Sequence, residues 1–404
     1  MKTLQLIKEA ILATLCITVV AILISLIPLK SDFVGPIKQE LDDFDIYDLF
    51  YSGKDTTHPG DKDPNIFIIQ AADDRLQIAE QIKKIKSLQP AVIGVDLSFE
   101  DNKEPVGDIK LKEELFSDSL IVPGFTVEND RNDKNHKLII KEKFLPNEYL
   151  MKNGGFINFP YAKDYSVIRF FHPFYTGDGV SYSSFAVRIA EIFSPAALNK
   201  IRKRNNDLEP INYYGNSEYY LNYTGDEFEK NFEGQQLGNL KGKIVLLGYF
   251  ANKGDNNAKA EDMFFSPLNT NPKLRNFRDI YGVIIHANII SMILSEHDYI
   301  TVLPRWASYF IGAILSILMN CLILYVYKKY KEPYHILFFV IELLVTISVV
   351  FLFIELYKWF NFKTPLLPIV LFIVLSIQMF DLYKMVARYF DKQFKYKTIF
   401  SGHS

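Results

Sequence analysis

The sequence has little cysteine. Of its 404 residues only two are cysteines, Cys16 and Cys321, and each lies within a long apolar segment. The polar region between those segments has no thiol, which excludes disulfides and cysteine chemistry there. Its stability must come from an ordinary hydrophobic core.

The central region also lacks net positive charge. The chain carries −2 overall, residues 1–9 carry +1 and residues 305–404 carry +6, which leaves −9 for residues 10–304. Nucleic-acid binding requires clustered basic side chains, so we expect no nucleic-acid partner. The sequence shows no internal repeat and no Ser-His-Asp or Cys-His signature. We expect no catalysis, no metal and no other cofactor.

Long apolar runs are abundant instead. The chain is 49% hydrophobic and 15% aromatic yet 23% charged, a composition typical of a soluble domain joined to membrane spans. Because about 20 apolar residues cross a bilayer, transmembrane helices are predicted at residues 10–29, 305–327, 336–357 and 364–384. The first run is long for a signal peptide and lacks a small-residue cleavage site, so we interpret it as an uncleaved anchor.

Positive charge orients these spans. Lysines precede the first span, three lie between the second and third, and five basic residues follow the fourth. Such segments stay in the cytoplasm. The sequence therefore predicts a multi-pass protein of the inner (cytoplasmic) membrane, with residues 1–9 and the tail 385–404 cytoplasmic. Residues 30–304 form the extracytoplasmic domain.

This domain is predicted to be α/β with a mixed, partly parallel sheet. Apolar strands are expected at residues 65–73 and 91–100, with a helix between them, and this βαβ unit makes the two strands parallel neighbours. Further strands are expected at 120–128 and 241–250, with short ones at INYY and YYLNY. A hairpin is expected over 154–175, with helices over 181–193 and 283–294.

Three carboxylates follow the first two predicted strands: Asp73, Asp74 and Asp96. The carboxyl ends of neighbouring parallel strands form the edge where open α/β sheets bind ligands. There the carboxylates would hold a cation or a cationic ligand. Alternatively, Asp73 or Asp74 caps the following helix and Asp96 only begins a loop.

The stretch YGVIIHANIISMIL places two polar residues, His286 and Asn288, in an apolar run too short to span a bilayer. In a buried helix each must find a partner or incur a desolvation cost. His286 is either a satisfied core histidine or a pH-sensitive link between sheet and helix, helped by Asn288. The other histidines show no spacing that would indicate a metal site with it.

Several segments appear in a particular order: IIQAADD, PAVIGVDLSF, GFINF followed by KDYSVIRFF, KGKIVLLG and GVIIHANII, with one span before them and three after. In this the chain resembles the type-two CHASE domains, extracytoplasmic sensory modules of bacterial signalling receptors, over about residues 30–385. The resemblance implies ligand sensing outside the cell and a cytoplasmic output domain. It also matches Asp164 and Arg169 to an acidic turn and a downstream arginine of the family. A hairpin turn with solvated flanks is the favoured explanation of both residues.

Only about 20 residues follow the last predicted span, so we expect the output on a separate polypeptide. The sequence thus favours a sensor that detects an unidentified ligand or envelope state and signals through a separate partner. Anchoring by helices on both sides of the domain is also compatible with a homodimer. One alternative is a non-catalytic scaffold subunit of an envelope complex. A second, less favoured, is an extracytoplasmic metal-dependent enzyme that uses Asp73, Asp74 and Asp96.

Four polar residues fall at similar depth in the three C-terminal spans: Asn320, Glu342, Gln378 and Asp381. Ionisable groups inside a membrane usually face partners. We expect either a polar cluster that ties the spans together or docks a partner's helix, or acidic side chains that simply reach the interface.

Overall fold

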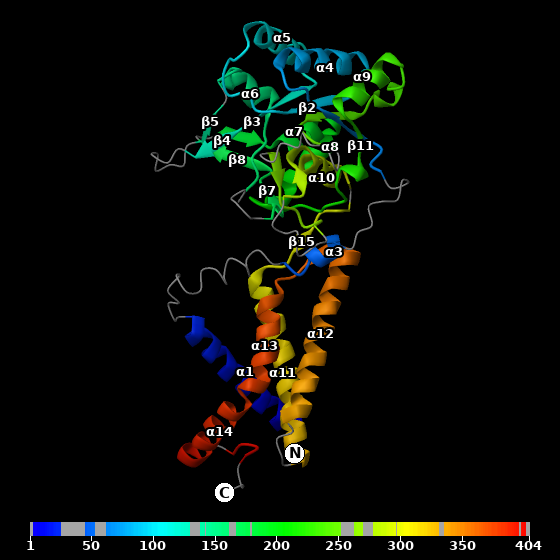
Figure 1. Cartoon of the computed structure of the whole chain (residues 1–404). Coiled ribbons are helices and arrows are strands. Elements are labelled where there is room, and N and C mark those ends of the chain that lie inside the picture. Colours follow the sequence, from blue (N-terminus) through cyan, green and yellow to red (C-terminus); the bar gives the residue numbers. More distant parts are fainter. Residues whose placement is uncertain are drawn as a thin grey trace. The chain divides into compact units, whose positions relative to one another are not determined.

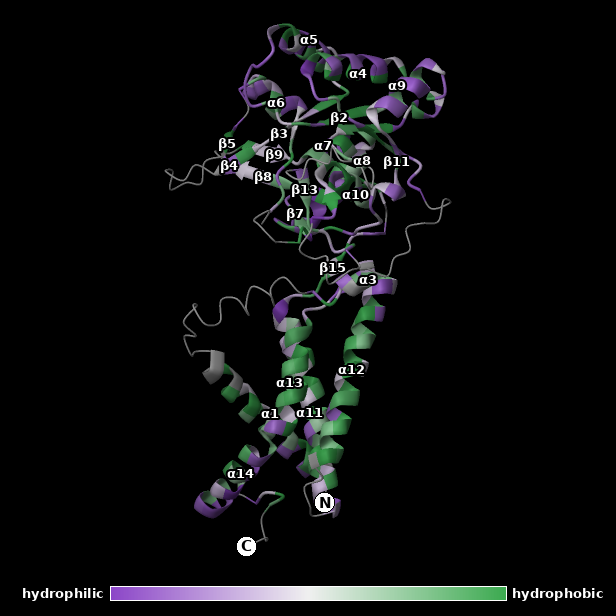
Figure 2. Ribbon diagram, viewed as in Figure 1, coloured by the Kyte–Doolittle hydropathy of each residue, from purple (hydrophilic) through white to green (hydrophobic). Residues whose placement is uncertain are grey.

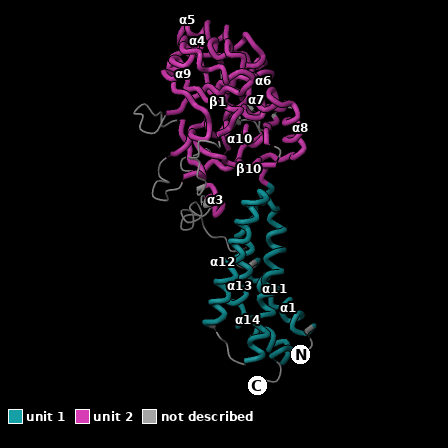
Figure 3. Tube along the Cα trace, turned by 90° about the vertical axis from the view of Figure 1, so that its right-hand side faces the viewer, with its two compact units in different colours: residues 1–42, 301–404 teal, residues 43–300 magenta. Residues whose placement is uncertain are grey.

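The computed structural model describes residues 3–25, 45–52, 62–129, 138–141, 143–160, 167–177, 180–251, 262–269, 278–295, 297–330, 335–395 and 397–400. The chain divides into two compact units. Unit 1 comprises residues 1–42 and 301–404, and unit 2 comprises residues 43–300 (Figure 3). Unit 2 is therefore inserted in the sequence between two segments of unit 1.

Unit 2 alternates strands and helices through most of its length. Its helices are α3 (Asp48–Ser52), α4 (Arg75–Ser87), α5 (Pro105–Phe116), α6 (Asn147–Asn153), α7 (Phe185–Phe193), α8 (Pro195–Arg204), α9 (Gly225–Glu233) and α10 (Gly282–Leu294). Its strands are β1 (Ile66–Gln70), β2 (Val92–Asp96), β3 (Ile121–Phe125), β4 (Val127–Asn129), β5 (Leu138–Ile140), β6 (Gly155–Phe156), β7 (Phe170–Phe171), β8 (Phe174–Gly177), β9 (Val180–Ser183), β10 (Glu209–Pro210), β11 (Leu221–Tyr223), β12 (Ile244–Gly248), β13 (Met263–Phe264) and β14 (Ile280–Tyr281).

The main sheet has six strands in the order β11-β1-β12-β2-β3-β6, and every pair in it is parallel. The predicted α/β class is confirmed. Antiparallel pairing among the described residues of unit 2 occurs only in small two-stranded sheets. The expectation that β1 and β2 are neighbours is wrong, because β12 pairs with both and lies between them.

The connections explain how the sheet is covered. The units β1-α4-β2, β2-α5-β3 and β11-α9-β12 all step in the same direction across the sheet. Right-handed crossovers then place their helices on one face, and Figure 1 shows α4, α5 and α9 together on that face, with α7 and α10 on the other. Alternate strand residues such as Phe67 and Ile69 pack under α4 and α9 with Ile82 and Phe228.

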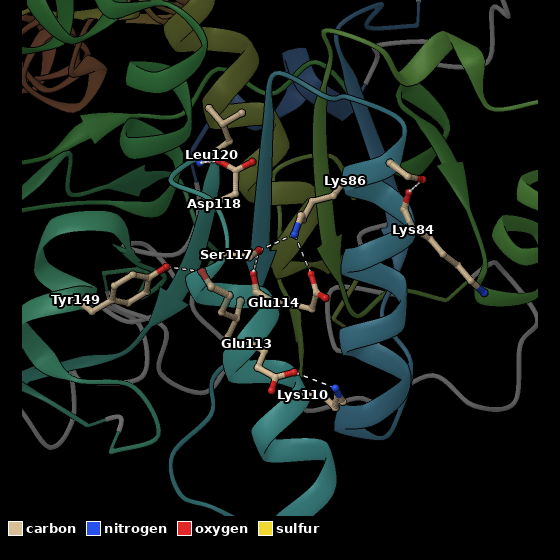
Figure 4. Close-up of polar contacts among 11 residues, drawn as sticks. Lys84, Lys86, Lys110, Glu113, Glu114, Ser117, Asp118, Leu120 and Tyr149 are labelled. Carbon is tan, nitrogen blue, oxygen red and sulfur yellow. Dashed lines mark hydrogen bonds and ion pairs between the residues drawn. The ribbon is translucent and has the colours of Figure 1, made fainter.

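Helix α4 shows how local sequence fixes this layer. Asp74 caps it, since its side chain accepts a hydrogen bond from the Gln77 backbone N–H. Its own buried residues include Ile78, Ala79, Ile82 and Ile85, which form the apolar side of the helix. On its outer side, Lys86 donates to Glu114 (3.0 Å) and Ser117 (2.6 Å) of α5, which fastens the two helices together (Figure 4).

Three other local predictions are wrong in whole or in part. The segments of the expected 154–175 hairpin do not pair with each other: β6 pairs with β3 and β7 pairs with β10. The expected helix over 181–193 begins only at Phe185, because the residues up to Ser183 belong to β9 and Ser184 is the N-cap. Of the two short strand candidates, YYLNY contains β11, whereas INYY is not a strand.

Unit 1 is largely helical. It contains α1 (Thr3–Ser25), α11 (Arg305–Tyr330), α12 (His335–Phe360), α13 (Leu366–Gln378) and α14 (Phe380–Phe394), with the short parallel strands β15 (Thr301–Val302) and β16 (Phe362–Lys363). Within the described residues α11 and α12 are long and apolar enough to cross a membrane, and α13 with α14 adds a third span if this pair, bent by 60°, counts as one. In Figure 2, α12 and α13 are mostly green (hydrophobic), whereas α14 shows much purple (hydrophilic). The protein is therefore membrane-associated through its C-terminal helices.

Candidate functional site

The carboxyl ends of the central strands lead into two adjoining hollows. In open parallel sheets this edge is where ligands bind. The smaller hollow is a cavity of about 230 Å³ beyond β2 and β12, and the larger is an open cleft of about 840 Å³ between α4 and α9. Tyr249, which directly follows β12, lines both.

The smaller cavity, which we call the Asp96 cavity, is bounded by the end of β2, the start of α10 and the segment around β13. The residues that line it are Asp96, Leu97, Ser98, Ile157, Phe159, Tyr249, Asp262, Phe264, Gly282, Val283 and His286. Gly248 allows α10 to lie against the strand ends, because a Cβ there would come within 2.9 Å of Val283. His286, one turn along α10, is thereby brought to the end of β2.

Asp96 and His286 face each other without a hydrogen bond. His286 Nε2 lies 3.7 Å from Asp96 Oδ1, and the two side chains are 3% and 10% exposed, respectively. That separation is too long for a hydrogen bond. Within the described part of the chain, the Asp96 carboxylate has no hydrogen-bond partner and His286 Nδ1 is likewise unpartnered. The ring of His286 stacks on Phe159, with ring centroids 4.7 Å apart, and meets Phe185 edge-on at 5.0 Å.

Burial shifts both groups toward their neutral forms. Burial, and secondarily the negative charge of Asp262, raises the pKa of Asp96 to about 7. Burial lowers the pKa of His286 to about 3, against a smaller opposing effect of the Ile157 backbone. At neutral pH the imidazole is uncharged, and Asp96 is close to its titration midpoint.

The larger cleft, which we call the acidic cleft, is polar. Its charged lining residues are Asp73, Glu80, Lys84, Asp226 and Glu229, with Lys84 ion-paired to Glu229. Gln70 organises its floor: it donates to the Phe250 carbonyl (2.7 Å) and accepts from the Gly225 N–H (3.1 Å). Asp73 lines this cleft, whereas Asp74 is the cap of α4.

The structure thus separates the three carboxylates that the sequence grouped. Asp73 and Asp74 lie at the end of β1, Asp96 lies at the end of β2, and β12 intervenes. The fold instead brings Asp96 close to His286, which comes from a distant part of the sequence. Among the described residues no group of three or more His, Cys, Asp or Glu side chains is arranged to hold a metal ion.

Asn288 faces a different part of the domain. Its Oδ1 accepts from the backbone N–H groups of Tyr214 (2.7 Å) and Gly215 (3.3 Å), and its Nδ2 donates to the carbonyls of Gly215 and Ile284. The side chain is fully buried and fully satisfied. It holds the loop before β11 rather than helping His286.

Arg169 makes a bidentate ion pair, but with Asp48 of α3. Nε lies 3.0 Å from Oδ1, and Nη2 lies 2.6 Å from Oδ2. Asp164, with which the sequence grouped it, lies outside the described residues. The two-point geometry fixes α3 against β7.

The four predicted intramembrane residues do not form one cluster. Asn320 donates to Thr14 of α1 (3.1 Å) and to Ser316 (3.3 Å), and Ser316 is 2.7 Å from Ser376 of α13. Glu342 is buried on α12 without a partner for Oε2 among the described residues, whereas Gln378 and Asp381 are exposed. The polar contact between α1, α11 and α13 is therefore made by Asn320 with hydroxyl residues.

Sequence reasoning overlooked the other walls of the Asp96 cavity: Phe159, Tyr249, Asp262 and Phe264. None of them belongs to a periodic pattern. The only sequence indication was that each adjoins a short apolar strand segment, GFINF, IVLLGYF or DMFF.

The structure thus shows a parallel α/β domain with a cavity at its strand ends, in a chain that also contains long apolar helices. A family model described as the CHASE2 domain matches residues 20–323. The chain belongs to this family of sensory domains, as the resemblance predicted. No curated protein and no solved structure matched it.

Proposed function

We propose that the protein is a membrane-anchored extracytoplasmic sensor, which detects a small ligand through unit 2 and signals through a separate partner protein. The observation that carries the proposal is the Asp96 cavity. It lies at the ligand-binding edge of the sheet, and its lining contains a buried carboxylate without a hydrogen bond among the described residues. Unsatisfied polar groups in a cavity with aromatic walls are typical of binding sites.

The order of the units along the chain supports transmission to the membrane. Both ends of unit 2 continue into unit 1, so a change in unit 2 acts on two connections. In this proposal α1 and α11–α13 cross the inner membrane, with unit 2 outside and both termini in the cytoplasm. The lysines at the end of α11 and the basic residues that follow α13 support this orientation.

Ligand binding is tested with the full-length protein in detergent. A library of small envelope and periplasmic metabolites is screened for compounds that raise the midpoint of thermal unfolding. Binding in the Asp96 cavity predicts that Gly282→Ala weakens the shift, because the new Cβ lies 3.8 Å from Asp96 Oδ2. The matched control is Gly225→Ala, at the start of α9, where a Cβ meets nothing within 4 Å.

The partner is tested by gentle-detergent purification followed by mass spectrometry. A copurifying kinase, cyclase or similar output protein is the expected result. Structural envelope proteins alone, together with no stabilising compound in the screen, would contradict the sensor and favour the scaffold.

A further inference from the structure

We propose that the Asp96 cavity is a receptor site for a small organic ammonium ion, with Asp96 as the carboxylate that binds the N–H groups. This rests on the proposed sensor function and names the ligand class. The argument combines the unpartnered carboxylate, the aromatic walls and the size of the cavity.

The charge of the lining selects a cation. Asp96 and Asp262 contribute two carboxylates, and no lysine or arginine is among the lining residues that the structure describes. An anion would be repelled by the buried Asp96 carboxylate, whose side chain is only 10% exposed, and this is strongly unfavourable. An ammonium group is instead attracted to the Asp96 carboxylate and supplies the hydrogen-bond donor that it lacks.

The neutral imidazole fits the same ligand. His286 lines the cavity and is 3% exposed, and its neutral ring has one acceptor nitrogen. A protonated histidine would repel an ammonium ion, but burial lowers the pKa of His286 to about 3. The imidazole therefore remains uncharged at neutral pH.

The aromatic residues account for the organic part. Phe159, Tyr249 and Phe264 line the cavity, and the rings of Phe159 and Phe264 pack edge to face at 5.3 Å. Aromatic faces attract cations and bury alkyl groups. A hydrated metal ion would not use such walls. Because one water-sized group takes about 30 Å³, 230 Å³ admits roughly seven such groups, which limits the ligand to a small amine.

Binding is linked to the ionisation of Asp96. The titratable groups that face it are His286 from α10, Asp262 beside β13 and Tyr249 after β12. Only the carboxylate form attracts an ammonium ion. Because the pKa of Asp96 is about 7, affinity should fall about tenfold per pH unit below that value. Affinity at pH 5 should therefore be about 100-fold lower than at pH 8.

The test is calorimetric titration of the full-length protein in nanodiscs with n-butylammonium, with 1-butanol as the uncharged analogue. A probe of five non-hydrogen atoms is limited to about micromolar affinity, so titrations extend to millimolar concentrations. We expect the ammonium ion to bind and the alcohol to bind at least tenfold more weakly. Asp96→Asn, which keeps the shape of the side chain, should reduce ammonium affinity at least tenfold and remove its dependence on pH.

Asp73→Asn is the matched control, because it removes the same charge from the acidic cleft and should leave affinity unchanged. Equal binding by wild type and Asp96→Asn, or loss of binding in Asp73→Asn alone, would overturn the assignment. A neutral or anionic compound that binds and is weakened by Gly282→Ala would overturn the ammonium class but leave the sensor intact. If neither amines nor any screened compound binds, both proposals fail.

Discussion

Two buried acid–base pairs of unit 2, Arg75 with Asp108 and His286 with Asp96, differ in how their polar atoms are hydrogen-bonded. Asp108 accepts an ion-paired hydrogen bond from Arg75 and two more from the backbone N–H groups of Lys103 (2.8 Å) and Glu104 (3.1 Å). Arg75 also donates to the Asp101 carbonyl and lies over the ring of Phe144. Asp96 and His286 are similarly buried but make no such bonds among the described residues.

The pKa values record this difference. Burial alone would raise the pKa of Asp108, but the hydrogen bonds from Arg75 and the backbone hold it below its ordinary value. With no such donors, burial raises the pKa of Asp96 to about 7. Removing one partner of a fully hydrogen-bonded buried pair destabilises the fold, because the other charge is left buried alone, whereas a buried charge without such bonds is already destabilising. We interpret the first pair as structural and the second as a site kept open for a ligand.

The largest expected loss of stability comes from breaking the pair of Arg75 and Asp108. Arg75→Ala leaves the Asp108 carboxylate buried without its cation, and we expect the free energy of unfolding to fall by about 3–5 kcal/mol. Chemical denaturation followed by circular dichroism measures this. The control is Lys110→Ala, which removes an exposed pair with Glu113 and should change stability by less than about 1 kcal/mol. Equal effects from both variants would mean that the buried pair is not structural.

Asp96→Asn should raise the free energy of unfolding at alkaline pH, whereas Arg75→Ala lowers it. The folded pKa of about 7 exceeds the ordinary value of 3.8, so the carboxyl's stabilising contribution is complete below pH 3.8 and is lost as pH rises to 7. At pH 8 the ionised carboxylate therefore costs on the order of 4 kcal/mol. Asp96→Asn should be more stable than wild type at pH 8, with the advantage shrinking toward pH 4. A variant less stable than wild type at pH 8 would show that the carboxylate is already satisfied.

His286→Phe should change the acid side of the stability profile. The folded pKa of His286 is about 3 against an ordinary 6.5, so its contribution is present above pH 6.5 and is lost as pH falls toward 3. Wild type should therefore lose about 2 kcal/mol from this group between pH 7 and pH 5. Phenylalanine keeps the ring packing against Phe159 and Phe185, and the variant should lack this loss. Parallel pH profiles for the two proteins would contradict the shift.

The smallest effect on stability is expected in unit 1. There Asn320 and the hydroxyl groups of Thr14 and Ser316 are hydrogen-bonded to one another but carry no charge. Asn320→Leu removes the hydrogen bonds to Thr14 and Ser316, and interhelical bonds of this kind contribute about 0.6–1.7 kcal/mol. The stability of the helical unit in detergent should fall by that amount. Leu322→Ala, at an exposed position of the same helix, is the control and should have a smaller effect.

The sequence predicted the positions of helices and strands better than it predicted which strands lie side by side in the sheet. The runs that became β1, β2 and β12 are apolar and β-branched, and the pair Asp73 and Asp74 marked the start of α4, so local chemistry was sufficient there. The capping box of Thr224 and Glu227 also marked α9, although it was overlooked. Strand order depends on long-range packing instead. No local feature indicated that β12 enters between β1 and β2, or that β6 and β7 pair with different strands.

The same reasoning explains the candidate site. Asp96 and His286 were each identifiable, one as a carboxylate at a strand end and the other as a polar residue in an apolar helix. That they face each other depends on Gly248 and on the return of α10 to the sheet. Asn288, only two residues along the same helix, turned out to be a fully satisfied structural residue.

The most direct test of the central claim is infrared difference spectroscopy of the full-length protein, which detects the carbonyl stretch of a protonated carboxyl group. A band assigned to Asp96 by its absence in Asp96→Asn should titrate with a midpoint near pH 7. At pH 6 it should disappear when n-butylammonium is added, because the bound cation holds Asp96 ionised. A midpoint near pH 4, or a band that the amine leaves unchanged, would contradict the claim that Asp96 is a carboxylate kept open for a cationic ligand.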